Sequence, residues 1–294
     1  MELRLISIII PAFNAERYLG AALESAVAQT YPRWEALVVV DAGCRDGTER
    51  VAREYAAKDA RIKVIMGPHE RMGAARNRGI AAAQGEYVAF LDADNLFAPD
   101  KLKKQLAHAA EHPEAGVLFG KILHFYDDKP EVRYANCNEA PPSGDLFVSF
   151  LRRNSINLLA ALIKKEHLAR YGAFRGEWPA LDDQYLWINL ARHGVGFAYS
   201  DDVVGYERMH RASDSRRSDH IYDTAKCFLS LLDNLERDFS DDERGNYLGV
   251  LGGLRRTWRR NLIIGWLMKT LPFSWAVLPW YLRRREGHFV KIDA

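Results

Sequence analysis

The chain has 294 residues, of which 48% are hydrophobic, so it can bury a substantial core and is too apolar to be disordered. Its 41 Lys and Arg residues nearly balance 39 Asp and Glu residues, and a formal charge of +2 gives no general electrostatic footprint for nucleic acid. Three widely spaced cysteines without a C-x-x-C pair indicate neither a disulfide framework nor a cysteine zinc site, and they favour a reducing, cytoplasmic location.

The first part of the chain alternates short apolar runs with segments of helical spacing. Residues 5–10, 35–40, 61–66 and 87–91 predict strands, and the apolar runs at 35–40 and 87–91 predict buried ones. Helical patterns follow the first three of these strands, and the third pattern covers residues 72–83. Strands that alternate with helices at such intervals predict a parallel sheet with right-handed crossovers.

The alternation of predicted strands and helices becomes less regular beyond Pro99. Residues 127–145 contain several Pro and Gly residues and predict a long loop. The remaining expected elements are a helix to Glu111, strands at 117–119, 156–163 and 203–208, a helix at 182–192, and helices from about 219 to the end. We therefore expect a catalytic domain at 1–218, with halves at about 1–120 and 121–218, and a helical C-terminal region at 219–294.

Asp92 and Asp94 directly follow the fourth predicted strand. Carboxylates in that position lie at the carboxyl edge of the sheet, where open α/β sheets bind ligands. Alternation along an extended segment directs both side chains the same way, so their oxygens can converge on one hard cation that carries a diphosphate. The alternative is an ordinary polar start of a loop.

Five ordered motifs of this chain resemble the GT-A glycosyltransferases of family 2, which are inverting enzymes that use sugar nucleotides. The motifs lie between about residues 5 and 215 and read IIIPAFNAERYL, LVVVDAGCRDGT, GAARNRGIAAAQGEYVAFLDADN, LDDQYLWINLARHG and GYERMHRASDS. The resemblance implies an α/β GT-A fold, in which helices flank a Rossmann-like, mostly parallel sheet, here with a helical C-terminal appendage.

The resemblance implies a divalent metal site made of Asp94 and His210, for Mn²⁺ or Mg²⁺. Such a cation neutralises the diphosphate leaving group without proton transfer. Imidazole suits Mn²⁺ better than Mg²⁺, which favours manganese. The alternative for His210 is an exposed loop histidine between Arg208 and Arg211.

Inversion needs one base that deprotonates the acceptor hydroxyl. Asp182 and Asp183 stand where the family usually has Glu-Asp. Repulsion between adjacent carboxylates can separate their pKa values and leave one better suited to accept a proton. We expect Asp183 to be the base and Asp182 to orient the acceptor or the base, with a simple helix cap as the alternative.

The resemblance also implies a set of residues that bind the nucleotide sugar. These are Pro11, Phe13, Asn14, Asp41, Arg76, Asp92 and Ala93. Arg76 is expected near the diphosphate or the base, and its alternative is a solvated helix face. Ala42 departs from the family, which usually has an Asp there that accepts from uracil N3–H. UDP is therefore the first expectation, with dTDP and GDP open.

Other classes of protein fit the sequence less well. A nucleotidyltransferase would carry a glycine-rich basic loop in place of residues 11–14, and an NAD-linked oxidoreductase would need G-x-G-x-x-G after the first strand. A retaining glycosidase uses two carboxylates and no metal. A non-catalytic donor-binding or scaffold subunit of a polysaccharide assembly complex stays open because of Ala42.

The expected acceptor is a glycan or a lipid-linked sugar, and a homodimer stays open. Residues 254–288 combine Arg and Lys with Trp and Tyr, which predicts peripheral contact with the cytoplasmic face of a membrane. Lys269, Pro272 and Pro279 disfavour a single span and favour two short interfacial helices broken near Pro272. Packing of this face on the catalytic domain, or on a second subunit, is the alternative.

Overall fold

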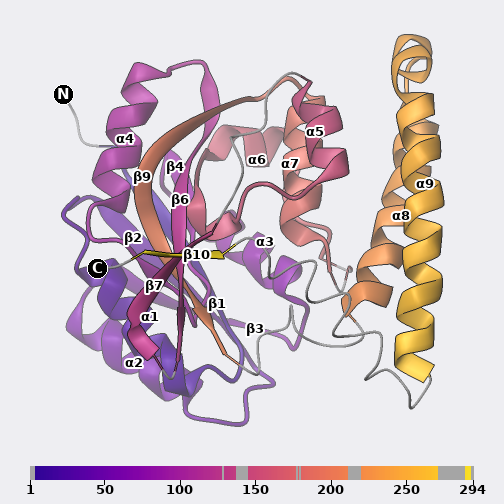
Figure 1. Ribbon diagram of the computed structural model, residues 1–294. Helices are drawn as coiled ribbons and strands as arrows, with labels where there is room; N and C mark the ends of the chain where they lie inside the picture. The colour runs from indigo at the N-terminus through magenta and orange to yellow at the C-terminus, as the bar shows by residue number, and fades with distance from the viewer. Residues whose placement is uncertain are drawn as a thin grey trace.

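The computed structural model describes residues 4–127, 129–136, 145–176, 178, 180–210, 220–270 and 289–292 (Figure 1). The strands are β1 (Ile6–Ala12), β2 (Trp34–Asp41), β3 (Ile62–Gly67), β4 (Tyr87–Phe90), β5 (Leu96–Phe97), β6 (Ala115–Tyr126), β7 (Lys129–Asn136), β8 (Ala161–Lys164), β9 (Gly196–Met209) and β10 (Phe289–Ile292). The helices are α1 (Glu16–Val27), α2 (Thr48–Lys58), α3 (Met72–Ala82), α4 (Lys101–Glu111), α5 (Leu146–Arg152), α6 (Lys165–Tyr171), α7 (Asp182–Arg192), α8 (His220–Asp238) and α9 (Asp241–Thr270), with a 3-10 turn at Leu158–Ala160.

The four predicted strands of the first half form the parallel part of one sheet. Its order is β4-β1-β2-β3, and every residue of β1, β2 and β4 is buried. Figure 1 shows α1, α2 and α4 on one side of this sheet and α3, α6 and α7 on the other. The structure confirms that the apolar runs at 35–40 and 87–91 form buried strands, whereas β3 lies at the edge of the sheet and exposes Lys63 and Met66.

The second half makes the sheet mixed. From β4 outward, β8, β6, β7 and β10 each run antiparallel to the preceding strand, while β9 runs parallel to β6. The prediction of a loop at 127–145 is wrong for 129–136, which form β7; residues 137–144 lie outside the described part. This segment forms a hairpin with β6 and also pairs with β10 from the far end of the chain, and tertiary pairing of this kind overrides a weak local preference for strand.

The C-terminal helices α8 and α9 form an antiparallel pair beside the sheet (Figure 1). Phe228 of α8 stacks on Trp258 of α9 with ring centroids 4.6 Å apart, and Leu231, Leu232 and Leu235 of α8 are also buried. The expectation of helix to the end of the chain is wrong at β10, which pairs with β7. The expected break near Pro272 lies outside the described residues. Within the described residues, none of the helices combines the length and apolarity that a membrane span requires.

Candidate active site

The strand pairing brings together the two segments predicted to hold a metal. Antiparallel pairing of β5 with β9 returns the end of β9 to the loop after β4. Arg208 then joins the two segments: its backbone N–H donates to Asn95 Oδ1 at 2.9 Å, and its Nε donates to the carbonyl oxygen of Asp94 at 2.9 Å. As a result Nε2 of His210 lies 3.0 Å from Oδ2 of Asp94, although 116 residues separate them.

The Asp94–His210 pair has donors that suit a divalent cation of the manganese type. Burial raises the pKa of the Asp94 carboxyl, and the charge of Asp92 raises it further, while His210 opposes both. Carboxylates that repel one another in this way form a site where a bound cation relieves the excess negative charge. The residues present therefore fit the expected metal, and Asp94 and His210 are the side chains that would hold it.

Arg76 on α3 links this pair of segments to the start of α7. Its guanidinium is buried and donates to Asp92 Oδ1 at 2.8 Å and to Asp182 Oδ2 at 3.3 Å. Burial opposes its charge, but Asp92 and Asp182 outweigh burial and raise the pKa of Arg76, so it stays cationic. The solvated-face alternative is thereby wrong for Arg76, whereas Arg78 pairs with Glu70 at 3.1 Å on the surface.

Asp182 and Asp183 occupy the first turn of α7 in different environments. Burial raises the pKa of Asp182 to about 6, against the opposing charge of Arg76, and its Oδ1 has no hydrogen-bond partner among the described residues. Asp183 instead accepts from Nδ2 of Asn154 at 2.8 Å. The N-cap residue is Leu181, whose φ of 76° is left-handed, so neither carboxylate is the N-cap of α7.

Gly73 permits the close approach of α3 to α7. A Cβ at position 73 would lie 3.2 Å from Oδ2 of Asp182 and 3.3 Å from the carbonyl oxygen of Arg175, both tighter than ordinary contacts. A larger residue would therefore push against the Asp182 carboxylate. Gly73 thus leaves the room that the Asp182 carboxylate occupies when it accepts from Arg76.

The residues expected around the nucleoside gather at the carboxyl ends of β1 and β2. Asp41 is buried; it accepts from the backbone N–H of Gly43 at 2.6 Å and of Glu70 at 3.2 Å, and its carboxylate lies 3.0 Å from Nδ1 of His69. Phe13 is half exposed, with its ring centroid 5.1 Å from that of His69. An open aromatic surface thus stands beside a fixed carboxylate.

Three further predicted residues shape the same region from within. Asn14 has a left-handed φ of 47°, and its Oδ1 accepts from the backbone N–H of Arg45 at 2.8 Å, so it ties together the loops after β1 and β2. Pro11 and Ala93 are buried. Ala42, the departure from the usual Asp, donates its backbone N–H to the carbonyl oxygen of Gly67 at 2.8 Å.

Sequence reasoning missed Glu207 on β9. Burial, and then the charges of Asp92, Asp94 and Asp183, raise the pKa of its carboxyl to about 7. It accepts from Nδ2 of Asn157 at 3.0 Å and lies 3.2 Å from Nδ1 of His124, whose pKa burial lowers to about 4. The available signal was a charged residue inside the predicted strand 203–208, three positions before His210.

The chain is similar to known proteins in sequence. Residues 7–163 match the family model described as glycosyl transferase family 2. The Bacillus subtilis protein EpsH, named as an inferred glycosyltransferase, is 29% identical over 259 residues, which cover 80% of this chain and 72% of EpsH. TuaG of the same organism, named as an inferred teichuronic acid biosynthesis glycosyltransferase, is 29% identical over 219 residues, which cover 72% of this chain and 82% of TuaG.

Solved structures share the fold at lower identity. TarS of S. aureus, residues 1–349 with UDP-GlcNAc, superposes with a TM-score of 0.62 at 17% identity and covers 90% of this chain and 73% of that one. The mannosyltransferase PcManGT of Pyrobaculum calidifontis, with GDP-Man and Mn²⁺, gives a TM-score of 0.58 at 19% identity and covers 96% and 81%. The family match over more than half of the chain shows that this protein belongs to glycosyl transferase family 2 and is a glycosyltransferase.

Proposed function

We propose that this glycosyltransferase is metal-dependent and inverting, and that it moves a sugar from a nucleoside-diphosphate donor, UDP first, to a glycan or lipid-linked acceptor. The observation that carries the proposal is one connected set of charged groups. It runs from the Asp94–His210 pair through Asp92 and the buried Arg76 to Asp182 and its neighbour Asp183. In this proposal the donor binds at the Asp94–His210 end of the set, and the base acts from the Asp182–Asp183 end.

In this proposal each residue has a distinct task. Asp94 and His210 hold the cation, which when bound neutralises the charge that develops on the departing diphosphate. Asp183 accepts the proton of the acceptor hydroxyl as that oxygen attacks the anomeric carbon and the bond to the diphosphate breaks on the opposite face. Arg76 donates to Asp182 and holds that carboxylate in position beside Asp183, so that the acceptor approaches from one side.

The preference for UDP rests on the region around Asp41. Phe13 offers a half-exposed ring on which a base can stack, and Asp41 is the carboxylate that remains after the loss of the usual Asp at position 42. TarS binds UDP-GlcNAc and PcManGT binds GDP-Man, so both carriers occur on this fold. A screen that includes UDP-, dTDP- and GDP-sugars is therefore required.

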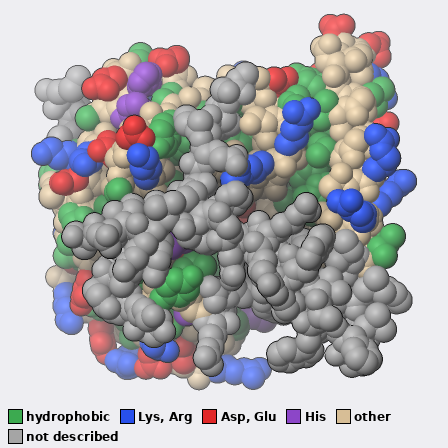
Figure 2. Space-filling model, in the orientation of Figure 1, with side chains coloured by type: hydrophobic (Ala, Val, Ile, Leu, Met, Phe, Trp, Pro, Cys, Tyr) green, Lys and Arg blue, Asp and Glu red, His purple; other side chains and the backbone are tan. Residues whose placement is uncertain are grey.

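The C-terminal region supports the proposed location at a membrane surface, where a lipid-linked acceptor would be found. Exposed Arg256, Arg259 and Arg260 lie on α9 near Ile263, whose side chain is 60% exposed, and Figure 2 shows basic side chains along the outer edge of the C-terminal helices. This set suits the surface of an anionic membrane on the cytoplasmic side. Trp258, predicted to face the membrane, instead stacks on Phe228 of α8. We also propose that the catalytic domain ends near residue 218 and that the helical C-terminal region begins there.

The test is a thermal-shift screen followed by transfer assays. A ligand that binds only the native state stabilises it, so the correct nucleotide sugar should raise Tm with Mn²⁺ or Mg²⁺ and not after EDTA. Asp94→Asn should lose this metal-dependent binding. Glu166→Gln, a change to an exposed carboxylate on α6, is the control and should behave as wild type. Equal donor binding and transfer with EDTA would refute the metal role, and donor binding without transfer to any acceptor would favour the scaffold alternative.

A further inference from the structure

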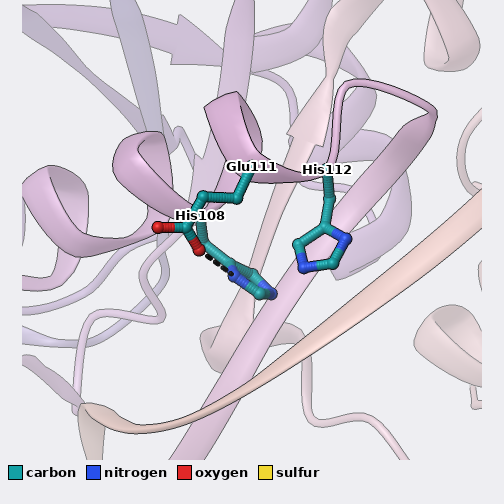
Figure 3. Close-up of side chains that lie close together, drawn as sticks. All are labelled: His108, Glu111 and His112. Carbon is teal, nitrogen blue, oxygen red and sulfur yellow. Dashed lines mark ion pairs between the residues drawn. The ribbon is translucent and has the colours of Figure 1, made fainter.

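A second group of metal-binding side chains lies on α4, away from the candidate active site. His108, Glu111 and His112 each offer one ligand atom, and these three atoms all lie within 4.8 Å of one another. Asp94 precedes the start of α4, whereas this group lies at the end of that helix, whose 11 residues span about 16 Å. Figure 3 shows the Glu111 carboxylate and the His112 ring on either side of the His108 ring.

We propose that His108, Glu111 and His112 form a binding site for a transition-metal cation, Zn²⁺ in the first place. Two imidazoles and one carboxylate are borderline ligands that suit Zn²⁺, and such a set leaves one tetrahedral position for water. His108 lies in the last turn of α4 and His112 is the C-cap residue of that helix, and their ring centroids are 4.5 Å apart. A site of this kind differs in place and ligands from the Asp94–His210 pair.

The distances require only small side-chain rotations. Ligands of tetrahedral zinc at about 2.0–2.1 Å lie roughly 3.4 Å from one another. Oε2 of Glu111 is already 3.7 Å from Nδ1 of His108, and the two imidazole centroids are 4.5 Å apart. The Glu111 side chain is 74% exposed and that of His112 is 43% exposed, so both are free to close the remaining gap against His108, which is 14% exposed and anchored.

Neighbouring groups prepare the two rings for a cation. Nδ1 of His112 lies 3.3 Å from Oε1 of Glu114, and an N–H donated there leaves the lone pair of Nε2 for a metal. Nδ1 of His108 lies nearest to Glu111, at 3.7 Å from its Oε2, and is the atom that would bind the cation, while Nε2 is buried without a hydrogen-bond partner among the described residues. The last turn of a helix carries partial negative charge, which favours a cation at this end of α4.

The site would tie the last turn of α4 to residues 112–114, which lead into β6. Its test uses the full chain carrying Asp94→Asn and His210→Gln, so that the candidate active site no longer competes for metal. Zn²⁺ alone is titrated by calorimetry, and Co²⁺ serves as a probe whose visible absorption reports four-coordination. We expect one Zn²⁺ per chain in this background.

His112→Gln should weaken Zn²⁺ binding by at least tenfold without unfolding the protein, because the side chain is largely exposed. Glu114→Gln should weaken it by about 10–100-fold, the usual cost of losing a group that orients a metal-ligating histidine. His193→Gln is the control, since that ring stacks on Tyr171 at 4.5 Å outside the group. In the otherwise wild-type chain, His112→Gln should leave transferase activity unchanged. A loss of Zn²⁺ binding in this variant can therefore be distinguished from a failure of the proposed function.

Two results would overturn the proposal. One is the absence of Zn²⁺ binding at submillimolar concentration in the background variant. The other is Zn²⁺ binding that His112→Gln and Glu114→Gln leave within twofold of the background value. Retention of the Co²⁺ absorption in His112→Gln would count in the same direction, because it would place the cation on other ligands.

Discussion

Replacement of Asp182 by Asn should change how stability depends on pH. Burial raises the pKa of Asp182 from its ordinary value of 3.8 to about 6, despite the opposing charge of Arg76. In the pH range between these values the folded protein holds a proton that the unfolded chain has lost. Stability from this group is therefore complete below pH 3.8 and is lost as the pH rises through about 6.

The size of this effect follows from the two pKa values. A difference between 3.8 and about 6 corresponds to ~3 kcal/mol of unfolding free energy, and about 2 kcal/mol of it develops between pH 4.5 and 7.5. The Asp182 side chain is only 15% exposed, so screening by solvent reduces the figure little. Asn cannot ionise, and it keeps an oxygen that can accept from Arg76.

Urea unfolding of wild type and Asp182→Asn at several pH values between 4.5 and 7.5 measures this quantity. The stability of the variant relative to wild type should rise with pH by about 2 kcal/mol. Glu166→Gln, at an exposed carboxylate, provides the control for general titration. If the relative stability stays constant within about 0.5 kcal/mol, or falls with pH, then ionisation of Asp182 does not destabilise the folded protein and the reasoning is wrong.

Three more changes test other parts of the structure. Asp183→Asn should keep donor binding in calorimetry and lower kcat by about 10²–10⁴-fold, and a variant with most of its turnover would contradict the base assignment. Gly79→Ala should cost about 1–3 kcal/mol in urea unfolding, because the added Cβ lies 2.5 Å from Cγ2 of Ile9; Gly245→Ala, with nothing within 4 Å, is its control. The full chain should float with anionic liposomes at low salt and be released at high salt, and Gln at the exposed Arg positions 256, 259 and 260 should abolish flotation; unchanged flotation would contradict the interfacial proposal.

The sequence alone determined the parallel half of the fold and which acidic residues follow its fourth strand. Apolar runs covered on both faces have a local signature, and the helix at 182–192 was predicted at its observed bounds because its periodicity and acidic first turn are also local. The position of Asp92 and Asp94 directly after such a run placed them at the carboxyl edge of the sheet. The family match agrees with the resemblance that the ordered motifs indicated.

Only the tertiary structure decided which charged groups meet and in what state. Arg76 was expected near the diphosphate or the base, but its burial against Asp182, 106 residues away, depends on the packing of α3 against the start of α7. The raised pKa of Glu207 and the pairing of β7 with β10 likewise come from partners distant in sequence. Desolvation and strand pairing are set by whichever segments cover a group, and residue type and local spacing carry no record of those segments.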